Sequence, residues 1–479
     1  MIKTIFKTTL LLIVLHHVNA QLIKNPKAFV SAGVFLSTSN QNPFWIRSNQ
    51  YGIVPLESQV LQLRGGYKTE YDSTKNIETH KLKKKFDYAF GAELVGNIGN
   101  ANQFIIPEAY FKTRLGAFEF YAGRRREIVG LVDTLLTSGS YIWSGNALPI
   151  PKIQISIPNY TSILGKGLVS IKGTFAHGWF ENNRPFTKHV KLHQKSFYGK
   201  LGRDNWKMNF YGGFNHNVQW GGESPFYSIN GKLPDGFRNY IHVLLGTRGA
   251  ITNSPENFDF DSNRVGNHLG TIDLGVSFKF KKNTILVYRQ NIYEDGSLFY
   301  LNNINDGLNG ISINLSNKVI KKLNFEFLNT FNQGGNEFKL IDGAPPELRG
   351  SDSYFNNAQF ADGWSYNFKT IGTPLILSAY ELENTKNVIF TKYNRTQAFS
   401  FSSIAELNAI TFFVRLSHFT NLGSYTETVP RKTSNSFWLN LKNKVPYKNI
   451  FFTLSLNYES TSGKKNILGT FFSANRIIK

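Results

Sequence analysis

The stretch KFDYAFGAELVG, from Lys85 to Gly96, carries an apolar side chain at every second position. Its two faces hold Phe86, Tyr88, Phe90, Ala92 and Leu94 on one side and Asp87, Ala89, Gly91 and Glu93 on the other. Successive side chains of an extended strand point to opposite faces, so this period of two predicts a β-strand with one apolar face. Either a protein core or lipid must cover that face.

The same alternation recurs along the chain, in segments 206–214, 271–280, 284–290, 311–315, 323–327 and 452–458. Tight connections, such as 202–205 and 281–283, alternate with long polar ones near 220–265 and 335–370. Many amphipathic strands joined in this way are typical of a transmembrane β-barrel, whereas a soluble β-sandwich needs fewer of them. Aromatic residues form 15% of the chain, as the girdles at the two membrane interfaces require. We therefore expect the apolar faces to meet lipid and the polar faces to line a lumen.

The first residues have the order of an export signal: basic Lys3 and Lys7, the apolar run Thr8–Leu15, and the small residues of Val18–Ala20. We expect residues 1–20 to be a signal peptide and 21–479 to form one barrel domain of about sixteen to twenty strands. Residues 21–80 could include a periplasmic or plug element, because PFWIRSNQYG (43–52) is suited to contact the barrel interior, although a first strand and turn is the alternative. Later apolar runs are interrupted by charges or glycines, which excludes a helical membrane protein.

The net charge constrains the partners. The chain has 54 Lys and Arg against 32 Asp and Glu, a formal charge of +22, and removing Lys3 and Lys7 leaves +20. Such an excess attracts polyanions. A cytosolic chain with this charge would suggest nucleic acid, but an exported chain meets acidic polysaccharide, lipopolysaccharide or anionic lipid. The chain has no cysteine, which excludes disulfides and thiolate metal sites.

Several motifs occur together in a specific order. Three long ones are Pro43–Gly52, Glu108–Glu127 and Ser138–Pro158, and LHQKSFYGKLG, NHNVQWGGES, NRVGNHLG and YRQNIYEDGSL follow them. The chain resembles the Wzi family of outer-membrane capsule assembly proteins, in the form common among Bacteroidetes. The resemblance covers most of the exported chain.

The resemblance implies an all-β, antiparallel transmembrane barrel of about eighteen strands, with a small helical or plug element at the periplasmic end. It implies a place in the bacterial outer membrane and a non-enzymatic, lectin-like role in attaching or organising capsular polysaccharide. The expected partners are acidic surface polysaccharide, outer-membrane lipid and the capsule export machinery, but no nucleic acid. An anion-selective, porin-like channel is the alternative function, and an outer-membrane hydrolase is a second rival.

The segment GRRRE places Arg124, Arg125 and Arg126 together. A guanidinium cannot face lipid at mid-depth, so these side chains must lie at a strand end or turn inward. They could bind the carboxylates of an acidic sugar, because the arginine fork matches a carboxylate. We favour an internal ion-pair network with carboxylates such as Glu93, Glu119 and Glu127 for the part of this cluster within the wall.

Two tryptophan segments are further candidates for sugar binding. Aromatic rings pack against sugar C–H faces while amides and charged groups reach the hydroxyls. The first segment offers His216, Asn217, Gln219 and Trp220, and the second offers Trp179, Asn182 and Arg184. A girdle tryptophan followed by a glycine turn explains Trp220 equally well, and the same choice applies to Trp179.

Other motifs favour structural roles. The histidines lack metal-ligand spacing, no catalytic signature appears, and we expect no metal, no cofactor and no enzymatic activity. Glu294 and Asp295 are interpreted as a polar turn or a structural contact in the lumen. Because proline removes a ladder hydrogen bond, the prolines at 149, 151 and 158 predict an extended stretch that crosses the lumen or caps one end.

Overall fold

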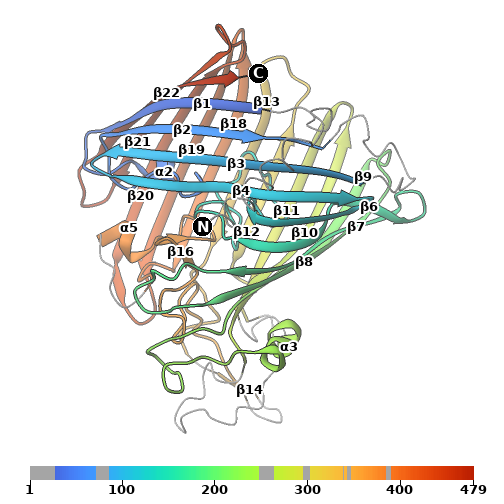
Figure 1. Cartoon of the computed structure of the whole chain (residues 1–479), viewed down its shortest axis with the longest axis vertical. Coiled ribbons are helices and arrows are strands. Elements are labelled where there is room, and N and C mark those ends of the chain that lie inside the picture. The colour runs from blue at the N-terminus through green and yellow to red at the C-terminus, as the bar shows by residue number, and fades with distance from the viewer. Residues whose placement is uncertain are drawn as a thin grey trace, which may run out of the picture.

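The strands form one closed antiparallel barrel (Figure 1). The computed structural model describes residues 27–71, 86–247, 264–294, 302–337, 339–341, 347–383 and 390–478, so the expected signal peptide lies outside the described residues. The main sheet has eighteen strands. Strand β1 (Lys27–Ser37) pairs with β2 (Val60–Lys68) and also with the last strand, β22 (Ile467–Ile478), which closes the ring. The predicted barrel class and strand number are confirmed.

Each neighbouring pair of wall strands is antiparallel, and the wall runs in chain order. The other wall strands are β3 (Phe86–Gly99), β4 (Gln103–Leu115), β5 (Phe118–Arg124), β6 (Lys152–Leu164), β7 (Val169–Trp179), β8 (Lys191–Leu201), β9 (Met208–Trp220), β10 (Asn267–Phe280), β11 (Asn283–Glu294), β12 (Gly307–Asn314), β13 (Ile320–Asn329), β18 (Thr396–Leu407), β19 (Ile410–Gly423), β20 (Thr428–Asn443) and β21 (Ile450–Thr461). The connection between β13 and β18 contains the hairpins β14 (Lys339–Ile341) with β15 (Glu347–Arg349) and β16 (Ser365–Tyr366) with β17 (Lys369–Thr370). The described helices are α2 (Phe44–Arg47), α3 (Phe237–Leu245) and α5 (Ala379–Glu383).

The two faces of the wall differ as the alternation predicted. In β3, Phe86 is 60% exposed and Leu94 is 48% exposed, whereas Asp87 and Glu93 are buried on the inner face. A barrel of this kind turns its apolar face to lipid and its polar face to the lumen. No helix in the described ranges combines the length and the apolar composition needed to cross a bilayer.

The two ends of the barrel differ in their connections. At the short-turn end, where the first described strand begins and the last one ends, the fully described turns are 116–117, 165–168, 202–207, 281–282, 315–319, 408–409 and 444–449. The connection 69–85 between β2 and β3 also lies at this end, and the structure describes it only as far as residue 71. At the long-loop end, the main connections are 38–59, 125–151, 221–266 and 330–395. Figure 1 shows the C-terminal strand ending at the top and α3 and β14 at the opposite end.

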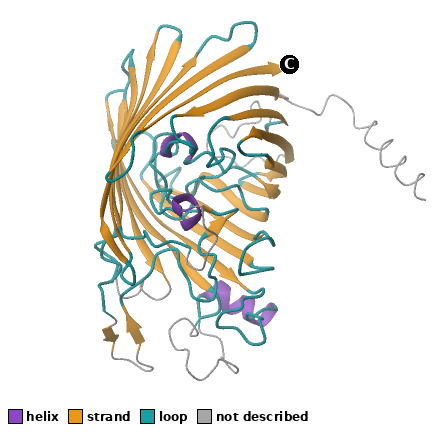
Figure 2. Ribbon diagram, turned by 90° about the vertical axis from the view of Figure 1, so that its left-hand side faces the viewer, coloured by secondary structure: helices purple, strands orange, loops and turns teal. Residues whose placement is uncertain are grey.

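The connections of the long-loop end fold back into the barrel, where loops and short helical turns occupy the space within the wall (Figure 2). Their side chains form two packed apolar clusters with the inner wall, which together we call the plug; Trp45, Tyr141 and Trp364 are fully buried in the larger one, and Ile46, Ile53 and Val54 belong to the smaller one. The indole of Trp45 donates to Ser417 Oγ over 3.1 Å, and that of Trp364 donates to the Ile142 carbonyl over 2.9 Å. The lumen therefore combines polar wall side chains with a packed centre, which alternation within the strands could not predict.

The described helices α2, α3 and α5 all belong to connections of the long-loop end. The segment 43–52, for which a plug and a first strand were both considered, contains α2 and is buried in the plug.

Glu294 accepts a hydrogen bond from the Phe355 backbone N–H over 3.0 Å, a structural contact in the lumen, whereas Asp295 lies outside the described residues.

The proline-rich segment 146–158 differs in part from its interpretation. Residues 146–150 are buried at the plug and Pro151 is half-buried, but Lys152–Leu164 is a wall strand that contains Pro158. The register of β6 against β7 shifts between Ile157 and Thr161. This irregularity places Pro158 where no ladder hydrogen bond is needed, which is how a sheet accommodates proline.

The lipid-facing assignment predicts the effect of a charge on the outer wall. Phe325 lies mid-strand in β13, is 46% exposed and packs beside Phe401, with ring centroids 4.9 Å apart. Phe325→Arg should destabilise the barrel in phospholipid vesicles by about 2–4 kcal/mol, because arginine must be desolvated there. Phe325→Leu, which keeps an apolar side chain, is the matched control. Denaturant unfolding in vesicles measures both, and equal stability of the two variants would rule out lipid contact at Phe325.

Candidate functional site

Arg125 and Arg126 belong to two groups of ion pairs on the inner wall and the adjoining loop, which we call together the ion-pair network. One group contains Arg64, Lys68, Arg126, Glu93 and Glu108, and the other contains Arg125, Lys152, Glu119 and Glu127. Glu93 lies 2.7 Å from Arg64 and 2.9 Å from Arg126. Arg125 lies 2.5 Å from Glu119 and 2.8 Å from Glu127. The favoured interpretation of this arginine cluster as an internal network is therefore confirmed for these two residues.

Arg124 lies apart from the network, in a cavity at the long-loop end that we call the rim pocket. The cavity has a volume of about 820 Å³ and lies between the start of β4, the end of β5 and the connection 330–395. The lining residues relevant to binding are Arg124, Tyr366, Asn367, Phe368, Lys369 and Tyr380, and the lining also contains one acid, Glu381, which forms an ion pair with Arg47. The rim pocket thus combines two cations, an amide and aromatic rings with a carboxylate that is already paired.

The hairpin β16–β17 presents aromatic side chains to the rim pocket. Its two-residue turn is Asn367-Phe368, and both residues have positive φ, 46° and 63°. Such a turn matches the twist of a tight hairpin, but positive φ is strained for a bulky residue and such strain is concentrated at functional sites. The Phe368 ring lies 5.2 Å from that of Tyr380 in α5. The strained turn therefore builds a pair of rings at the pocket.

Arg184 holds this hairpin in place through hydrogen bonds to its backbone. Its Nη2 donates to the carbonyls of Gly363 and Ser365 over 3.1 and 3.2 Å, and its Nε lies 3.8 Å from Asp362. Asp362 in turn accepts a hydrogen bond from the Thr187 backbone N–H over 2.8 Å. Because Arg184 is buried and held by these groups, it positions the hairpin, and a ligand in the rim pocket does not reach it.

Arg124 keeps its charge available to the rim pocket. Its Nη2 donates to Tyr366 Oη over 2.7 Å, and its Nη1 donates to the Ile106 carbonyl over 3.4 Å. Among the described residues, no carboxylate lies within ion-pair distance of Arg124. A guanidinium held by neutral acceptors but lacking a counterion is suited to bind an external anion.

Lys369 is the second cation of the rim pocket. Its Nζ donates to the Val54 carbonyl over 2.7 Å. Burial lowers the pKa of Lys369 to about 8, and nearby Glu381 opposes this shift. Glu381 itself forms an ion pair with Arg47, which joins α5 to α2. The charge of Lys369 is therefore partly lost as the pH rises through about 8, while that of Arg124 remains.

The residues of the first tryptophan segment lie on opposite faces of β9. Asn217 accepts a hydrogen bond from Gln194 over 3.0 Å on the inner face, and Gln219 donates to the Gly363 carbonyl over 3.0 Å. His216 and Trp220 point outward, on the same face as the exposed Phe214. The period of two therefore separates the ring of Trp220 from the amides proposed to assist it.

Helix α3 covers that outer patch. The Trp220 ring lies 5.2 Å from that of Tyr240, and His216 Nε2 is 2.9 Å from His268 Nδ1.

Trp179 also points outward and is 42% exposed, as a girdle residue would be. Asn182 lies in the loop after β7, where it accepts the His189 backbone N–H over 3.0 Å. Of the ten candidates, the structure thus brings only Arg124 to the rim pocket, while Arg184 is buried and holds the hairpin that lines it.

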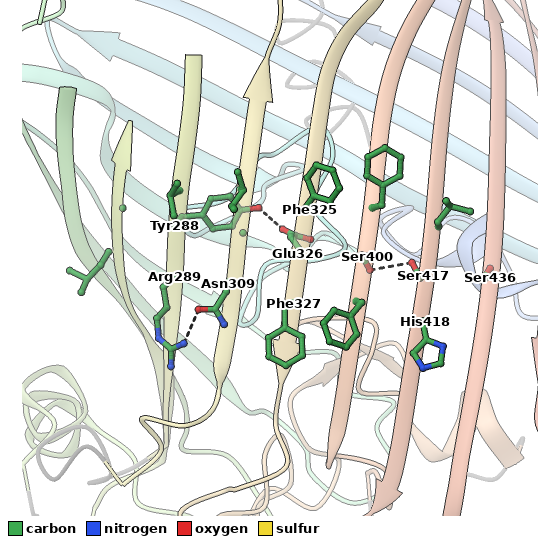
Figure 3. Close-up of a pocket in the computed structure, with 18 of the residues that line it drawn as sticks. Tyr288, Arg289, Asn309, Phe325, Glu326, Phe327, Ser400, Ser417, His418 and Ser436 are labelled. Carbon is green, nitrogen blue, oxygen red and sulfur yellow. Dashed lines mark hydrogen bonds between the residues drawn. The ribbon is translucent and has the colours of Figure 1, made fainter. Parts of the chain in front are cut away.

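A larger hollow, of about 1150 Å³, lies on the outer wall (Figure 3). Phe325 and Phe327 point into it, whereas Glu326 points to the other side of the sheet and accepts a hydrogen bond from Tyr288 over 2.6 Å. The hollow is lined mainly by exposed apolar residues of the lipid-facing surface, such as Leu274 and Phe399. We therefore assign it to the lipid-facing surface and not to a sugar site.

Sequence reasoning missed Tyr366, Phe368, Lys369 and Tyr380. Tyr366, Phe368 and Lys369 belong to the segment 335–370, which its glycines, asparagines and aspartates identified as a long polar connection, and Tyr380 lies ten residues beyond it. The aromatic density of residues 354–368 was an available signal, because exposed loops seldom carry so many rings. The positive φ of Phe368 could not be read from an Asn-Phe pair, since glycine is the usual residue there.

Comparisons with known proteins are consistent with the fold. The family described as capsule assembly protein Wzi matches residues 50–400. The solved structure of Escherichia coli Wzi, described as an outer-membrane, carbohydrate-binding β-barrel involved in group 1 capsule assembly, is 14% identical and has a TM-score of 0.57. That match covers 97% of this chain and 87% of the other. No curated protein matches the chain.

Two other solved barrels show weaker similarity. Acinetobacter baumannii OccAB4 is 7% identical, with a TM-score of 0.46 and coverage of 96% of this chain and 100% of the other. Pseudomonas aeruginosa OccK5 is 9% identical, with a TM-score of 0.45 and coverage of 95% and 99%.

The ion-pair network predicts a stability effect for Glu93, whose side chain is 2% exposed between Arg64 and Arg126. Glu93→Gln leaves both arginines without this carboxylate. Because the arginines are partly exposed, we expect a loss of about 2 kcal/mol, less than for a fully buried pair. Thermal unfolding in detergent measures it, with Lys465→Gln in an exposed turn as the control. Equal unfolding temperatures for the two variants would show that the network does not stabilise the barrel.

The strained turn predicts a difference between two substitutions of Phe368. Both Phe368→Gly and Phe368→Ala remove the ring contact with Tyr380, but only glycine adopts positive φ without cost. The glycine variant should be more stable than the alanine variant by about 1 kcal/mol. Thermal unfolding followed by circular dichroism compares them, and an alanine variant as stable as the glycine variant would disprove the strain.

Proposed function

The chain belongs to the Wzi family of capsule assembly proteins, and from this membership we propose that it binds acidic capsular polysaccharide at the bacterial surface without cleaving it. Barrels of the outer membrane place short turns in the periplasm and long loops outside. That rule directs the long-loop end, and with it the rim pocket, toward the capsule. An export signal at residues 1–20 is part of this proposal.

The observation that carries the proposal is an unpaired guanidinium beside aromatic rings. Arg124 lacks a carboxylate partner among the described residues, and Phe368 and Tyr380 line the same pocket, whereas the buried Tyr366 holds Arg124 through its hydroxyl. Rings pack against the C–H faces of sugars, and the arginine fork binds a uronate carboxylate through two hydrogen bonds. Asn367 adds an amide that can reach hydroxyl groups. Acidic sugar is the ligand class that uses all three features.

The overall charge supports the same ligand class. The formal charge of +20 that remains without Lys3 and Lys7 creates an attractive field for polyanions. Such a field concentrates acidic polysaccharide near the surface, and the rim pocket then selects the sugar unit. The capsule export machinery stays a proposed partner, since a polysaccharide held outside must first cross the envelope.

The alternative functions find less support. A channel needs a continuous aqueous path, but Trp45, Tyr141 and Trp364 are packed in the centre of the barrel. A hydrolase of the serine type needs serine and histidine side chains together, and in the described part of the chain neither residue type lines the rim pocket. We therefore favour non-covalent binding.

The rim pocket predicts the loss of affinity in one variant. Arg124→Gln keeps a hydrogen-bond donor but removes the charge, so binding of a uronate oligosaccharide should weaken by about 10- to 100-fold, from the usual 1.5–3 kcal/mol of a charged hydrogen bond. Calorimetry in detergent measures this affinity. Arg203→Gln, in a turn at the short-turn end, is the matched control. An Arg124→Gln variant with unchanged affinity would refute the role of this residue.

The proposed role also predicts a cellular phenotype. Deletion of the gene in the source bacterium should release polysaccharide into the medium while its export continues, because the surface holds it less firmly. The wild-type gene should restore cell-bound polysaccharide and the Arg124→Gln variant should restore less of it. Measuring cell-bound and released polysaccharide in each strain shows whether the protein retains polysaccharide at the surface. Undiminished cell-bound polysaccharide in the deletion strain would contradict the proposal.

A further inference from the structure

A second cavity lies inside the barrel at the short-turn end, and we call it the vestibule. It has a volume of about 580 Å³. Lys27 at the start of β1 and Lys442 near the end of β20 lie at its outer part, and Ile46 and Ile53 of the plug close it within. Val54 of the plug contacts both this cavity and the rim pocket, so the plug separates the two.

The vestibule is basic. Its charged lining residues are Lys27, Arg64, Lys68, Arg126, Lys442 and a single acid, Glu93. Arg64 and Arg126 share Glu93, and Lys68 is 3.9 Å from Glu108. Within the described ranges, Lys27 and Lys442 have no carboxylate at ion-pair distance. This excess of positive charge inside a confined space favours an anionic occupant.

The uncharged lining of the vestibule resembles that of a carbohydrate site. The rings of Phe413 and Trp438 lie 4.8 Å apart, and Lys442 Nζ lies 5.2 Å from the centre of the Phe451 ring. Asn440 donates to Ser455 Oγ over 2.5 Å, and both residues line the cavity. A bare phosphate needs no aromatic surface, and a lipid chain needs no amides, so rings, amides and cations together fit an acidic sugar.

We propose that the vestibule is a second binding site, which takes a segment of an anionic saccharide from the periplasmic side. Its volume is within the range of cavities that hold small ligands. Lys27 and Lys442 neutralise the carboxylates, and Trp438 and Phe451 pack against the sugar rings. This site does not depend on the rim pocket. A protein with both sites contacts acidic glycan on either side of its plug.

Calorimetry on the full chain in detergent tests this proposal, with an alginate hexasaccharide as the anionic probe. The double variant Lys27→Gln/Lys442→Gln should lose one class of site, with affinity reduced at least about 10-fold, and should keep the class that Arg124→Gln removes. The single variant Lys465→Gln, at the opposite end of the barrel, should change neither class. Circular dichroism and the retained rim binding show that the double variant is folded.

The outcomes separate this proposal from the function of the rim pocket. If Arg124→Gln alone abolishes all binding, the vestibule proposal is overturned and the rim proposal stands. If the double variant alone abolishes all binding, the rim proposal is overturned and the vestibule proposal stands. Maltohexaose, a neutral probe, should bind neither site, and equal binding of maltohexaose overturns the requirement for an anion. Inorganic phosphate that displaces the hexasaccharide from the vestibule at equal concentration overturns the assignment to a saccharide.

Discussion

The closure of the sheet between β1 and β22 is the constraint on which the rest of this molecule depends. The pairing runs in register from Ala28 with Ile478 to Ser37 with Gly469. In a bilayer, every backbone N–H and C=O group must find its partner within the protein. Once the ring is closed, the outer face can consist of side chains such as Phe86 and Leu94, which lipid covers, and the inner face can keep charges such as Glu93.

The closed wall also leaves its long connections free to turn inward. They fill the centre with buried rings, and hydrogen bonds fix those rings to the wall, as between Trp45 and Ser417. The plug then places functional groups at the two ends of the barrel. At the long-loop end, Arg184 holds the hairpin whose turn presents Phe368 beside Arg124. At the short-turn end, the plug forms the inner limit of the vestibule.

How far the sequence could predict this molecule depends on the range of the interactions involved. The alternation around Phe86 predicted its strand and the orientation of its faces, because side-chain direction is a local property. The partners of Arg125 were predictable too, since lipid excludes an unpaired guanidinium. The plug and the rim pocket depend on segments hundreds of residues apart, such as Trp45 with Ser417, and no local pattern shows such contacts. The period of two also places Trp220 and Asn217 on opposite faces of the sheet, but only if the strand continues to Trp220, as it does in the structure.

We propose that a lumen closed by packed rings holds carbohydrate at its ends, and we expect that it does not conduct ions or solutes. Single-channel recording in planar lipid bilayers tests this most directly, with a general porin inserted under the same conditions as a positive control. A plugged barrel should insert without producing steady current steps. Sustained, anion-selective conductance comparable to that of the porin would show an open aqueous path and contradict the plugged structure and the binding function built upon it.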